Sequence, residues 1–350
     1  MTFKVPKGKK GLVQFIYFEE IKFMKKKLIS LLTIAAMSLA MFTGCGSKDE
    51  SGDLEKVSMA FCTWTGYSPM FIALEKGYFE EAGIDMDIQV IEDESTYTSL
   101  ITKGAVQFLA TAVDPNIKMY ANGADSRYVL TMDNSCGADG LVATADITSL
   151  DDLKGKTVAL DKSASSYYFF LKALEQDSSL TEADVEVLDM GDTTEAGLAF
   201  MAGNVDAAIM WEPELSEALD SVDGAHLVIS TEDYPDTVMD SLVVNTTYAA
   251  ENPEIVAAVE EAWYKAVDFL NENPDEAHEL MASGFEEVSA EDIAADLEGL
   301  EIYGKADNEA LLSGTNGKSI KDISQDMADF WMAKGECDSN DLTAFFELIK

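Results

Sequence analysis

Short apolar, β-prone runs alternate with stretches of helical periodicity along most of the chain. The runs that predict strands cover 57–62, 84–91, 106–112, 129–132, 141–144, 157–160, 185–188, 206–210 and 242–245. The stretches that predict helices cover 69–77, 96–104, 165–175, 193–203, 252–271 and 322–334, and one more helix starts at 273–274. Strands that alternate with helices in this way predict an α/β fold with mainly parallel strands.

One local unit occurs twice in this pattern. In both 103–106 and 202–205 a glycine ends a predicted helix and a valine two residues later enters a predicted strand. Glycine is common at such helix ends because it adopts the left-handed conformation without strain. We therefore expect one copy of the unit in each of two lobes. The chain after Asn245 is strongly helical and has no further sheet of its own, so these helices are expected to pack on the first lobe.

The N-terminal region has the pattern of an export signal. Three lysines follow Met24, an apolar run covers 28–42, and the sequence Thr-Gly-Cys45 ends it. A basic head and an apolar run of this length are typical of a signal peptide, and the run is short for a membrane span. Small residues before a cysteine resemble the lipobox of bacterial lipoproteins. We expect a signal peptide at 24–44, a lipid on Cys45, and a polar tether at 45–56.

Two points about this region stay open. An ordinary signal peptide that happens to end near a cysteine is the alternative to lipidation. Residues 1–23 do not fit the scheme, because a signal peptide does not begin behind a mixed segment that contains Glu19 and Glu20. We expect translation to start at Met24, so that 1–23 is a leader assigned in error.

The charge of the chain excludes several partners. There are 24 Lys and Arg against 65 Asp and Glu, which gives a formal net charge of −41. Nucleic acids and anionic lipid headgroups both require basic patches, so neither is a partner, and membrane contact is expected only through the lipid. The hydrophobic content of 47% is that of a packed globular protein, so the acidity belongs to the surface.

Catalytic and metal-binding residue types are scarce. The chain has two histidines, and beyond Cys45 its cysteines are Cys62, Cys136 and Cys337, with no CxxC pair. The chain therefore lacks enough histidines and clustered cysteines for a zinc site or for a Ser-His or Cys-His nucleophile. We expect no metal, no cofactor and no enzymatic activity. Cys62 and Cys136 would pair if oxidised, but free thiols are the favoured interpretation.

Two loops at predicted strand ends are rich in aromatic residues. The first contains Trp64, Gly66 and Tyr67 directly before a helix, and the second contains Trp211 and Glu212 directly after a strand. Loops at the carboxyl ends of strands line the ligand crevice of doubly wound α/β folds. We interpret both loops as ligand-binding, with ordinary core or rim aromatics as the alternative for the first.

Polar residues mark two further loops. Three serines open the helix predicted after 157–160, namely Ser163, Ser165 and Ser166. Any one of them would serve as an N-cap, but together they offer hydroxyl and backbone N–H donors to an anion. Asp240 interrupts an apolar run and is either a paired structural carboxylate or a ligand for a cation. Asp114 and Ser135 are weaker candidates of the same kind.

Taken together, these segments resemble the substrate-binding lipoproteins of ABC importers, in the group that binds sulfonates, taurine, nitrate and thiamine precursors (NMT1/THI5-like). The matching segments are 66–69 with 73–79, 153–159, 163–174, 203–208 with 211–213, 240–244 and 252–254. The resemblance implies a type II periplasmic-binding-protein fold with two Rossmann-like lobes and a hinge of two crossing strands. It implies lobes at 57–139 with 240–350 and at 140–239, an extracytoplasmic monomer, and a permease and an ATPase as partners.

The charged residues of the candidate loops favour a solute with an amine. Arg127 is the only arginine and lies outside these loops, so no guanidinium from them can hold an acid. Asp114, Glu212 and Asp240 beside aromatic rings favour a cationic group, whereas the serines suit an acid. We therefore expect a small zwitterionic or anionic organic solute of the taurine or aliphatic sulfonate kind. A zwitterion such as taurine satisfies both groups of residues, with its amine on Asp240 or Glu212 and its acid on the serines. A thiamine pyrimidine precursor or another nitrogen heterocycle is the alternative solute, and nitrate fits worst.

Two alternatives to transport remain open from the sequence. One is an enzyme of thiamine-pyrimidine synthesis on the same fold, although the cysteine-rich motif and active histidine of its eukaryotic members are absent here. The other is a surface protein that presents its solute to a sensor.

Overall fold

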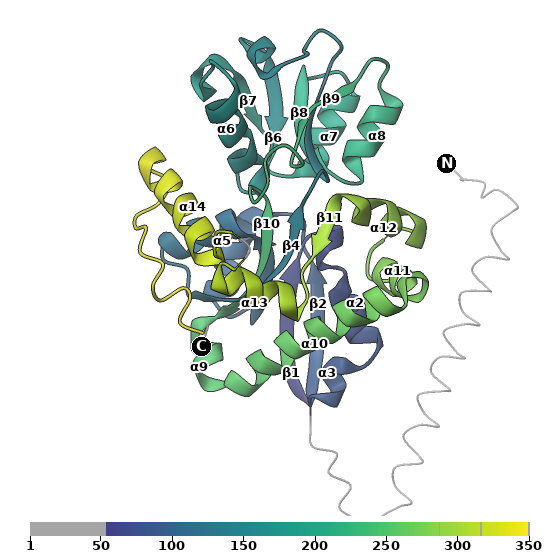
Figure 1. Ribbon diagram of the computed structural model, residues 1–350, viewed down its shortest axis with the longest axis vertical. Helices are drawn as coiled ribbons and strands as arrows, with labels where there is room; N and C mark the ends of the chain where they lie inside the picture. The colour runs from purple at the N-terminus through teal and green to yellow at the C-terminus, as the bar shows by residue number, and fades with distance from the viewer. Residues whose placement is uncertain (1–53, 287, 316, 349–350) are drawn as a thin grey trace, which may run out of the picture. The chain divides into compact units, whose positions relative to one another are not determined.

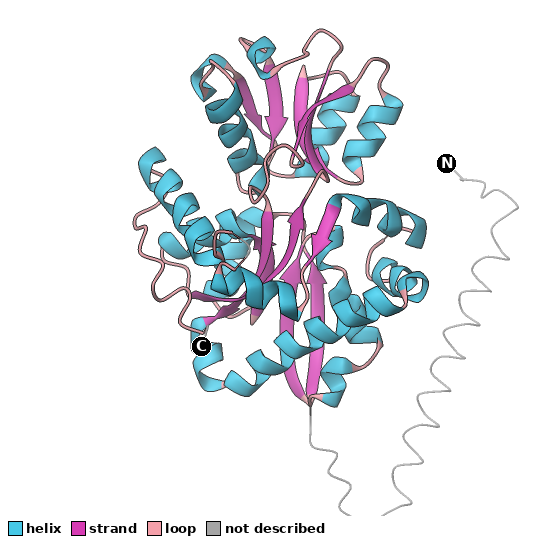
Figure 2. Ribbon diagram, in the orientation of Figure 1, coloured by secondary structure: helices cyan, strands magenta, loops and turns pink. Residues whose placement is uncertain are grey.

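Two mixed β-sheets, each flanked by helices, organise the chain (Figures 1 and 2). The computed structural model describes residues 54–286, 288–315 and 317–348. The predicted leader, the signal peptide, Cys45 and most of the tether therefore lie outside the described residues.

The first sheet has six strands. They are β1 (Glu55–Phe61), β2 (Ile84–Val90), β3 (Phe108–Ala112), β4 (Ser126–Ser135), β10 (Met239–Asn245) and β11 (Leu300–Ile302), in the spatial order β11-β4-β10-β3-β1-β2. Every residue of β3 and β10 is buried, as expected for apolar runs in the middle of a sheet. At the edge, the first four residues of β2 alternate between buried and exposed.

The second sheet has five strands. They are β5 (Asp139–Ala143), β6 (Thr157–Leu160), β7 (Glu186–Asp189), β8 (Ala207–Trp211) and β9 (His226–Ser230), in the order β7-β6-β8-β5-β9. This order repeats that of the first sheet, because β7-β6-β8 corresponds to β2-β1-β3 and a reversed strand follows in each. The predicted repeat is part of this correspondence, and both of its glycines have the left-handed conformation, with φ of 64° at Gly104 and 72° at Gly203.

Strand direction refines the expectation of mainly parallel strands. In the first sheet β1 to β4 run one way while β10 and β11 are reversed, and in the second β6 to β9 run one way while β5 is reversed. Both β5 and β10 enter their sheet from the other one, which is why they point against their neighbours.

The chain crosses between the sheets twice, at 136–138 and at 231–238. Hydrogen bonds join the two crossings. Ser135 N donates to the Val238 carbonyl over 2.9 Å, and Gly137 N donates to Thr231 Oγ1 over 2.8 Å. The Ser135 and Thr231 hydroxyls lie 2.7 Å apart. The crossings therefore form one linked pair, as a hinge requires.

Thirteen α-helices surround the sheets in the part of the chain that the structure describes. They are α2 (Pro69–Glu75), α3 (Tyr78–Glu81), α4 (Tyr97–Thr102), α5 (Val113–Ala121), α6 (Ser165–Asp177), α7 (Thr193–Met201), α8 (Glu214–Ser221), α9 (Thr246–Glu251), α10 (Pro253–Glu272), α11 (Pro274–Ala282), α12 (Ala290–Asp296), α13 (Lys305–Ser313) and α14 (Ile320–Lys334). Proline stands at the first position of α2, α10 and α11, where its missing N–H costs nothing.

The C-terminal helices pack on the first lobe, as expected. Helix α10 lies against α2, and α14 lies against α5 (Figure 1). Helix α14 also reaches the second lobe, which the sequence did not indicate. Its Trp331 ring centroid lies 5.6 Å from that of Tyr167 and 5.8 Å from that of Tyr168, both on α6.

The described residues contain no helix long and apolar enough to cross a membrane, and no group of three or more His, Cys, Asp or Glu side chains placed to hold a metal ion. Cys62, Cys136 and Cys337 are all free thiols. Cys62 and Cys136 are therefore not paired in this structure.

Candidate ligand-binding site

The ends of four strands bring the candidate residues to one place. Asp240, near the start of reversed β10, pairs with Ala112 at the end of β3. Asp139, the first residue of reversed β5, pairs with Trp211 at the end of β8. The amino ends of the reversed strands therefore lie at the same sheet edges as the carboxyl ends of their neighbours, where ligands bind in open α/β sheets.

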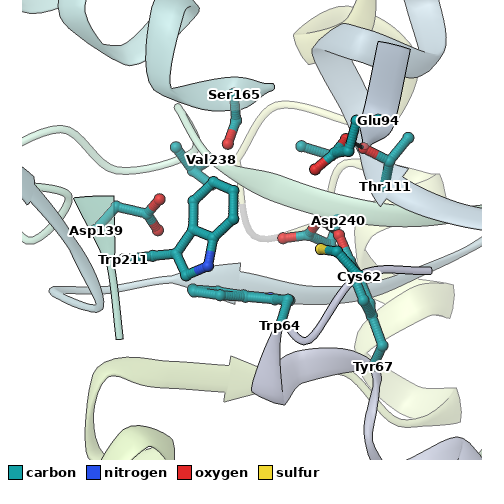
Figure 3. A pocket seen from close by; sticks show the side chains of 11 residues that line it. Cys62, Trp64, Tyr67, Glu94, Thr111, Asp139, Ser165, Trp211, Val238 and Asp240 are labelled. Carbon is teal, nitrogen blue, oxygen red and sulfur yellow. Dashed lines mark hydrogen bonds between the residues drawn. The ribbon is translucent and has the colours of Figure 1, made fainter. Parts of the chain in front are cut away.

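A pocket lies between these edges, and both lobes contribute to it (Figure 3). It is lined by Cys62, Trp64, Tyr67, Glu94, Thr111, Ala112, Asp139, Ser165, Trp211, Val238 and Asp240. The free space at its centre is about 10 Å³, which is about what one water molecule needs. The lining side chains must therefore move apart before an organic solute can enter. We call this space the acidic pocket.

Two tryptophans form the aromatic wall of the acidic pocket. The indoles of Trp64 and Trp211 meet edge to face, with centroids 6.1 Å apart and an interplanar angle of 77° (Figure 3). Trp64 Nε1 donates a hydrogen bond to Asp133 Oδ1 over 3.1 Å, which fixes this ring. Gly66 permits the arrangement, because a Cβ there would lie 2.5 Å from Trp64 Nε1 and from Asp133 Cγ.

Three buried carboxyl groups face the pocket from different elements. Glu94, after β2, accepts a hydrogen bond from Thr111 Oγ1 over 2.5 Å. Asp240 accepts one from the Tyr67 hydroxyl, and Asp133 lies behind it as a second buried acid. Asp139 is 1% exposed, and its Oδ2 has no hydrogen-bond partner among the described residues. Such an oxygen is costly unless a ligand or water pairs with it.

Burial raises the pKa of all three groups. The pKa is about 8 for Glu94, about 7 for Asp139 and about 6 for Asp240. Burial also raises the pKa of Asp133, and the neighbouring Asp240 raises it further, so the two adjacent acids do not both ionise readily. Among the described residues that line the pocket there is no Lys, Arg or His. A cationic ligand would supply the positive charge that the ionised carboxyl groups of the pocket lack.

Neutral donors border the pocket at the start of helix α6. Helix α6 begins at Ser165, which lines the pocket, and no side chain caps the free N–H groups of its first turn. Ser166 is fully buried, and its hydroxyl has no hydrogen-bond partner among the described residues. The start of a helix that has free N–H groups favours an anion. The site therefore offers acids and donors to the same ligand.

The structure brings five of the predicted residues to the acidic pocket: Trp64, Tyr67, Ser165, Trp211 and Asp240. Gly66 lies against the Trp64 indole, and Ser166 follows Ser165 in the first turn of α6. Ligand contact by any of these residues stays a prediction.

The other four predicted residues have different surroundings. The Glu212 carboxylate accepts hydrogen bonds from N and Oγ of Ser216, at 3.0 and 2.9 Å, and so caps α8 instead of facing the pocket. Ser135 belongs to the crossing segments. The Ser163 hydroxyl donates to Asp161 Oδ1 over 2.6 Å in a local turn. Asp114 is buried in α5 beside Lys118 and does not line the pocket.

Sequence reasoning missed six lining residues, namely Cys62, Glu94, Thr111, Ala112, Asp139 and Val238. Glu94 follows a predicted strand in an acidic loop, so the rule used for the other loops would have found it. Asp139 carries no such signal, because it starts a strand. Only the reversed direction of β5 places it at the ligand edge.

Fold and site together define a two-lobed solute-binding protein of the periplasmic-binding-protein type. The chain belongs to the family described as NMT1/THI5 like, whose model matches residues 64–277. It is 29% identical over 267 residues to a Bacillus subtilis protein named for the binding of aliphatic sulfonates. The matched region covers 74% of this chain and 78% of the relative. It is 25% identical over 269 residues to a formylaminopyrimidine-binding protein of Halalkalibacterium halodurans, with coverage of 75% and 80%.

A solved structure has the same fold. The periplasmic aliphatic sulphonate binding protein SsuA from Escherichia coli matches with a TM-score of 0.64 and 22% identity, over 82% of this chain and 94% of that one. At this identity the likeness concerns the fold alone.

Proposed function

We propose that this chain is the extracytoplasmic solute-binding component of an ABC importer, and that its solute carries a protonated nitrogen. The leading candidate is a small zwitterion of the taurine or aminoalkyl sulfonate kind. The chain captures the solute between its lobes and passes it to a permease that an ATPase drives. A lipid on Cys45 keeps the protein at the membrane surface beside that permease.

The observation that carries the proposal is the acidic pocket itself. Glu94, Asp139 and Asp240 converge there without a basic side chain among the described lining residues. Buried carboxylates are stable only when a cation or several donors accompany them. A protonated amine between Asp139 and Asp240 supplies both charge and donors, and the faces of Trp64 and Trp211 add cation–π attraction.

The acid end of a zwitterion has a place as well. The uncapped start of α6, with the Ser165 hydroxyl that lines the pocket, offers neutral donors to a sulfonate or carboxylate. A purely anionic solute such as nitrate would use only this half, and would lie against the three carboxyl groups. We therefore place it last among the candidates.

A nitrogen heterocycle is the second candidate solute. The paired indoles of Trp64 and Trp211 suit the flat ring of a thiamine pyrimidine precursor, and amino groups on such a ring would donate to the carboxyl oxygens. The relative named for formylaminopyrimidine binding supports this candidate.

Solute capture requires movement of the lobes. The space of about 10 Å³ in the acidic pocket admits no organic molecule in the present arrangement, and the two linked crossings are the place where the lobes can bend apart. Contacts that a solute makes with both lobes at once favour the closed form, which is how a binding protein signals loading.

We propose no enzymatic activity for this site. A nucleophilic cysteine needs a lowered pKa, whereas burial and the nearby Glu94 raise the pKa of Cys62 well above its usual value. The described lining residues include no histidine that could act as its base. The carboxyl groups are arranged to bind a cation, and none of them lies beside an activated nucleophile.

A thermal-shift screen tests the proposal. Purified protein is heated with aminoalkyl sulfonates, amino acids, polyamines, aminopyrimidines and plain anions, and tryptophan fluorescence serves as the second readout because Trp64 and Trp211 line the pocket. We expect stabilisation by solutes that contain a basic or donor nitrogen. A melting temperature that rises only with plain anions such as nitrate or ethanesulfonate would overturn the proposal.

The affinity for a solute with a protonated amine is expected to increase with pH. The Asp240, Asp139 and Glu94 carboxyl groups ionise with pKa values of about 6, 7 and 8, so affinity for a protonated amine rises as the pH increases from about 5 to about 8. The stability of the unliganded protein changes in the opposite direction. The pKa values of these carboxyl groups are higher in the folded protein than in the unfolded chain. Their contribution to the free energy of unfolding is therefore complete below pH ~4 and is lost as the pH rises through the folded-state pKa values.

Titration calorimetry at several pH values, together with urea unfolding of the unliganded protein, measures both trends. Glu94→Gln should flatten the upper part of the affinity profile near pH ~8, where the Glu94 carboxyl group ionises. Affinity that stays constant across the titration range of these carboxyl groups would contradict a role for them.

A further inference from the structure

A second hollow adjoins the acidic pocket and differs from it in charge. It is lined by Glu94, Ser95, Tyr97, Thr98, Thr111, Pro115, Lys118, Met119, Asn122, Lys162 and Ser163. Glu94 and Thr111 line both spaces, so the two lie next to each other. Its free volume is about 350 Å³, compared with about 10 Å³ in the acidic pocket. We call it the lysine hollow.

The two lysines come from different lobes. Lys118 is on α5 beside the first sheet, and Lys162 is in the loop between β6 and α6. Both ammonium groups lie over the ring of Tyr167, with Nζ 5.9 and 4.7 Å from its centroid. Because Tyr167 belongs to the first turn of α6, both positive charges lie near the start of that helix.

The charge of the lysines is only partly neutralised. Lys162 Nζ lies 3.2 Å from Glu182 Oε1. Lys118 takes part in no ion pair within 4 Å among the described residues, and its Nζ lies 4.2 Å from the centroid of the Trp331 ring. The nearby acids Asp114 and Glu94 are buried, and burial raises the pKa of each to about 8, so both are mostly neutral at pH ~7. The hollow can therefore attract an anion.

We infer that the lysine hollow, whose Lys162 and Ser163 directly precede α6, completes the site at the start of that helix for the acidic group of the solute, while the protonated nitrogen lies in the acidic pocket. The inference rests on the proposed function and narrows it to a class of solute: a chain with an amine at one end and a sulfonate, carboxylate or phosphate at the other. The volumes support this division, because the lysine hollow is much larger than the acidic pocket and can hold the longer, acidic part of the solute. Since Lys118 and Lys162 lie on different lobes, an acid between them also joins the lobes.

A matched series of ligands and variants tests the inference. The ligands are ω-aminoalkanesulfonates with two to five carbons, the ω-aminocarboxylates of the same lengths, and the ω-amino alcohols, which keep the amine but lack the acid. The proteins are the unaltered chain, Lys118→Gln, Lys162→Gln and the control Lys172→Gln. Lys172 is also on α6, but it pairs with Glu175 and does not line the hollow.

Calorimetry then separates the two ends of the ligand. We expect the acid to raise affinity at least about tenfold over the amino alcohol at one or two chain lengths, and both hollow variants to remove that increase. The amino alcohols should bind all four proteins alike. Equal affinity of acids and alcohols for the unaltered protein, or equal losses for both ligand classes in the hollow variants, would overturn the inference. If no amine binds at all, the proposed function itself fails, which is a different result.

Discussion

Asp240→Asn is expected to weaken the binding of an amine-bearing solute by about 100-fold, because it removes a buried negative charge that would contact the ammonium group. The fold should survive. The substituted amide can still accept the hydrogen bond of the Tyr67 hydroxyl and can donate to Asp133, and the variant relieves the juxtaposition of two buried acids. We expect the melting temperature of the unliganded variant to equal or exceed that of the unaltered protein.

Glu212→Gln is the matched control for this variant. Sequence reasoning treats both acids as partners for the amine, whereas the structure shows that the Glu212 carboxylate caps α8 through Ser216. A glutamine can keep that cap, so binding should stay within about twofold. Calorimetric titration of both variants decides the matter. Equal losses of affinity would mean that general negative charge attracts the solute and that Asp240 has no direct contact with it.

Gly66→Ala is expected to lower the free energy of unfolding by about 3 kcal/mol, combining the cost of an overpacked core with that of a buried donor without its partner. A Cβ at this position would lie 2.5 Å from Trp64 Nε1 and from Asp133 Cγ, and all of these groups are buried. The Trp64 indole or the Asp133 carboxyl group must move away, so the hydrogen bond that fixes the wall of the acidic pocket is lost. Urea unfolding measures the first effect, and solute titration the second.

Gly304→Ala provides the comparison for this substitution. Gly304 precedes α13, and the nearest heavy atom to an added Cβ is Val267 Cγ1 at 3.5 Å, an ordinary contact. We expect a loss of less than about 1 kcal/mol and unchanged solute binding. If the two glycine variants lose the same stability, the close approach at Gly66 has no special importance.

Much of the fold follows from local signals in the sequence. Pro69 and Pro253 mark helix starts, Gly104 and Gly203 mark helix ends, and the apolar run at 157–160 coincides with β6. Each of these signals acts within a few residues, so it can be recognised without knowledge of the tertiary structure. The aromatic loops were found for the same reason, since a strand end next to a helix start is itself a local feature.

The parts of the fold and site that the sequence did not predict depend on how segments far apart in the chain pair with each other. Asp139 reaches the acidic pocket because β5 is antiparallel to β8, and nothing near Asp139 specifies that direction. Glu212 and Ser163 lie in loops that the sequence marks as ligand-binding, but their side chains form hydrogen bonds with Ser216 and Asp161 instead. Which partner such a side chain takes depends on its rotamer, which the sequence does not show. The contact of Trp331 with α6 joins segments far apart in the sequence, which hydrophobic periodicity cannot predict.

The buried carboxyl groups are proposed to select a solute through its protonated nitrogen. The most direct measurement of this selection is a calorimetric titration with taurine and with ethanesulfonate at pH ~8, where the Asp240 and Asp139 carboxyl groups are largely ionised. Ethanesulfonate has the same acid and carbon chain but lacks the amine. We expect measurable binding of taurine and binding of ethanesulfonate that is at least about 100-fold weaker. Equal binding of the two, or tighter binding of ethanesulfonate, would contradict selection through the nitrogen.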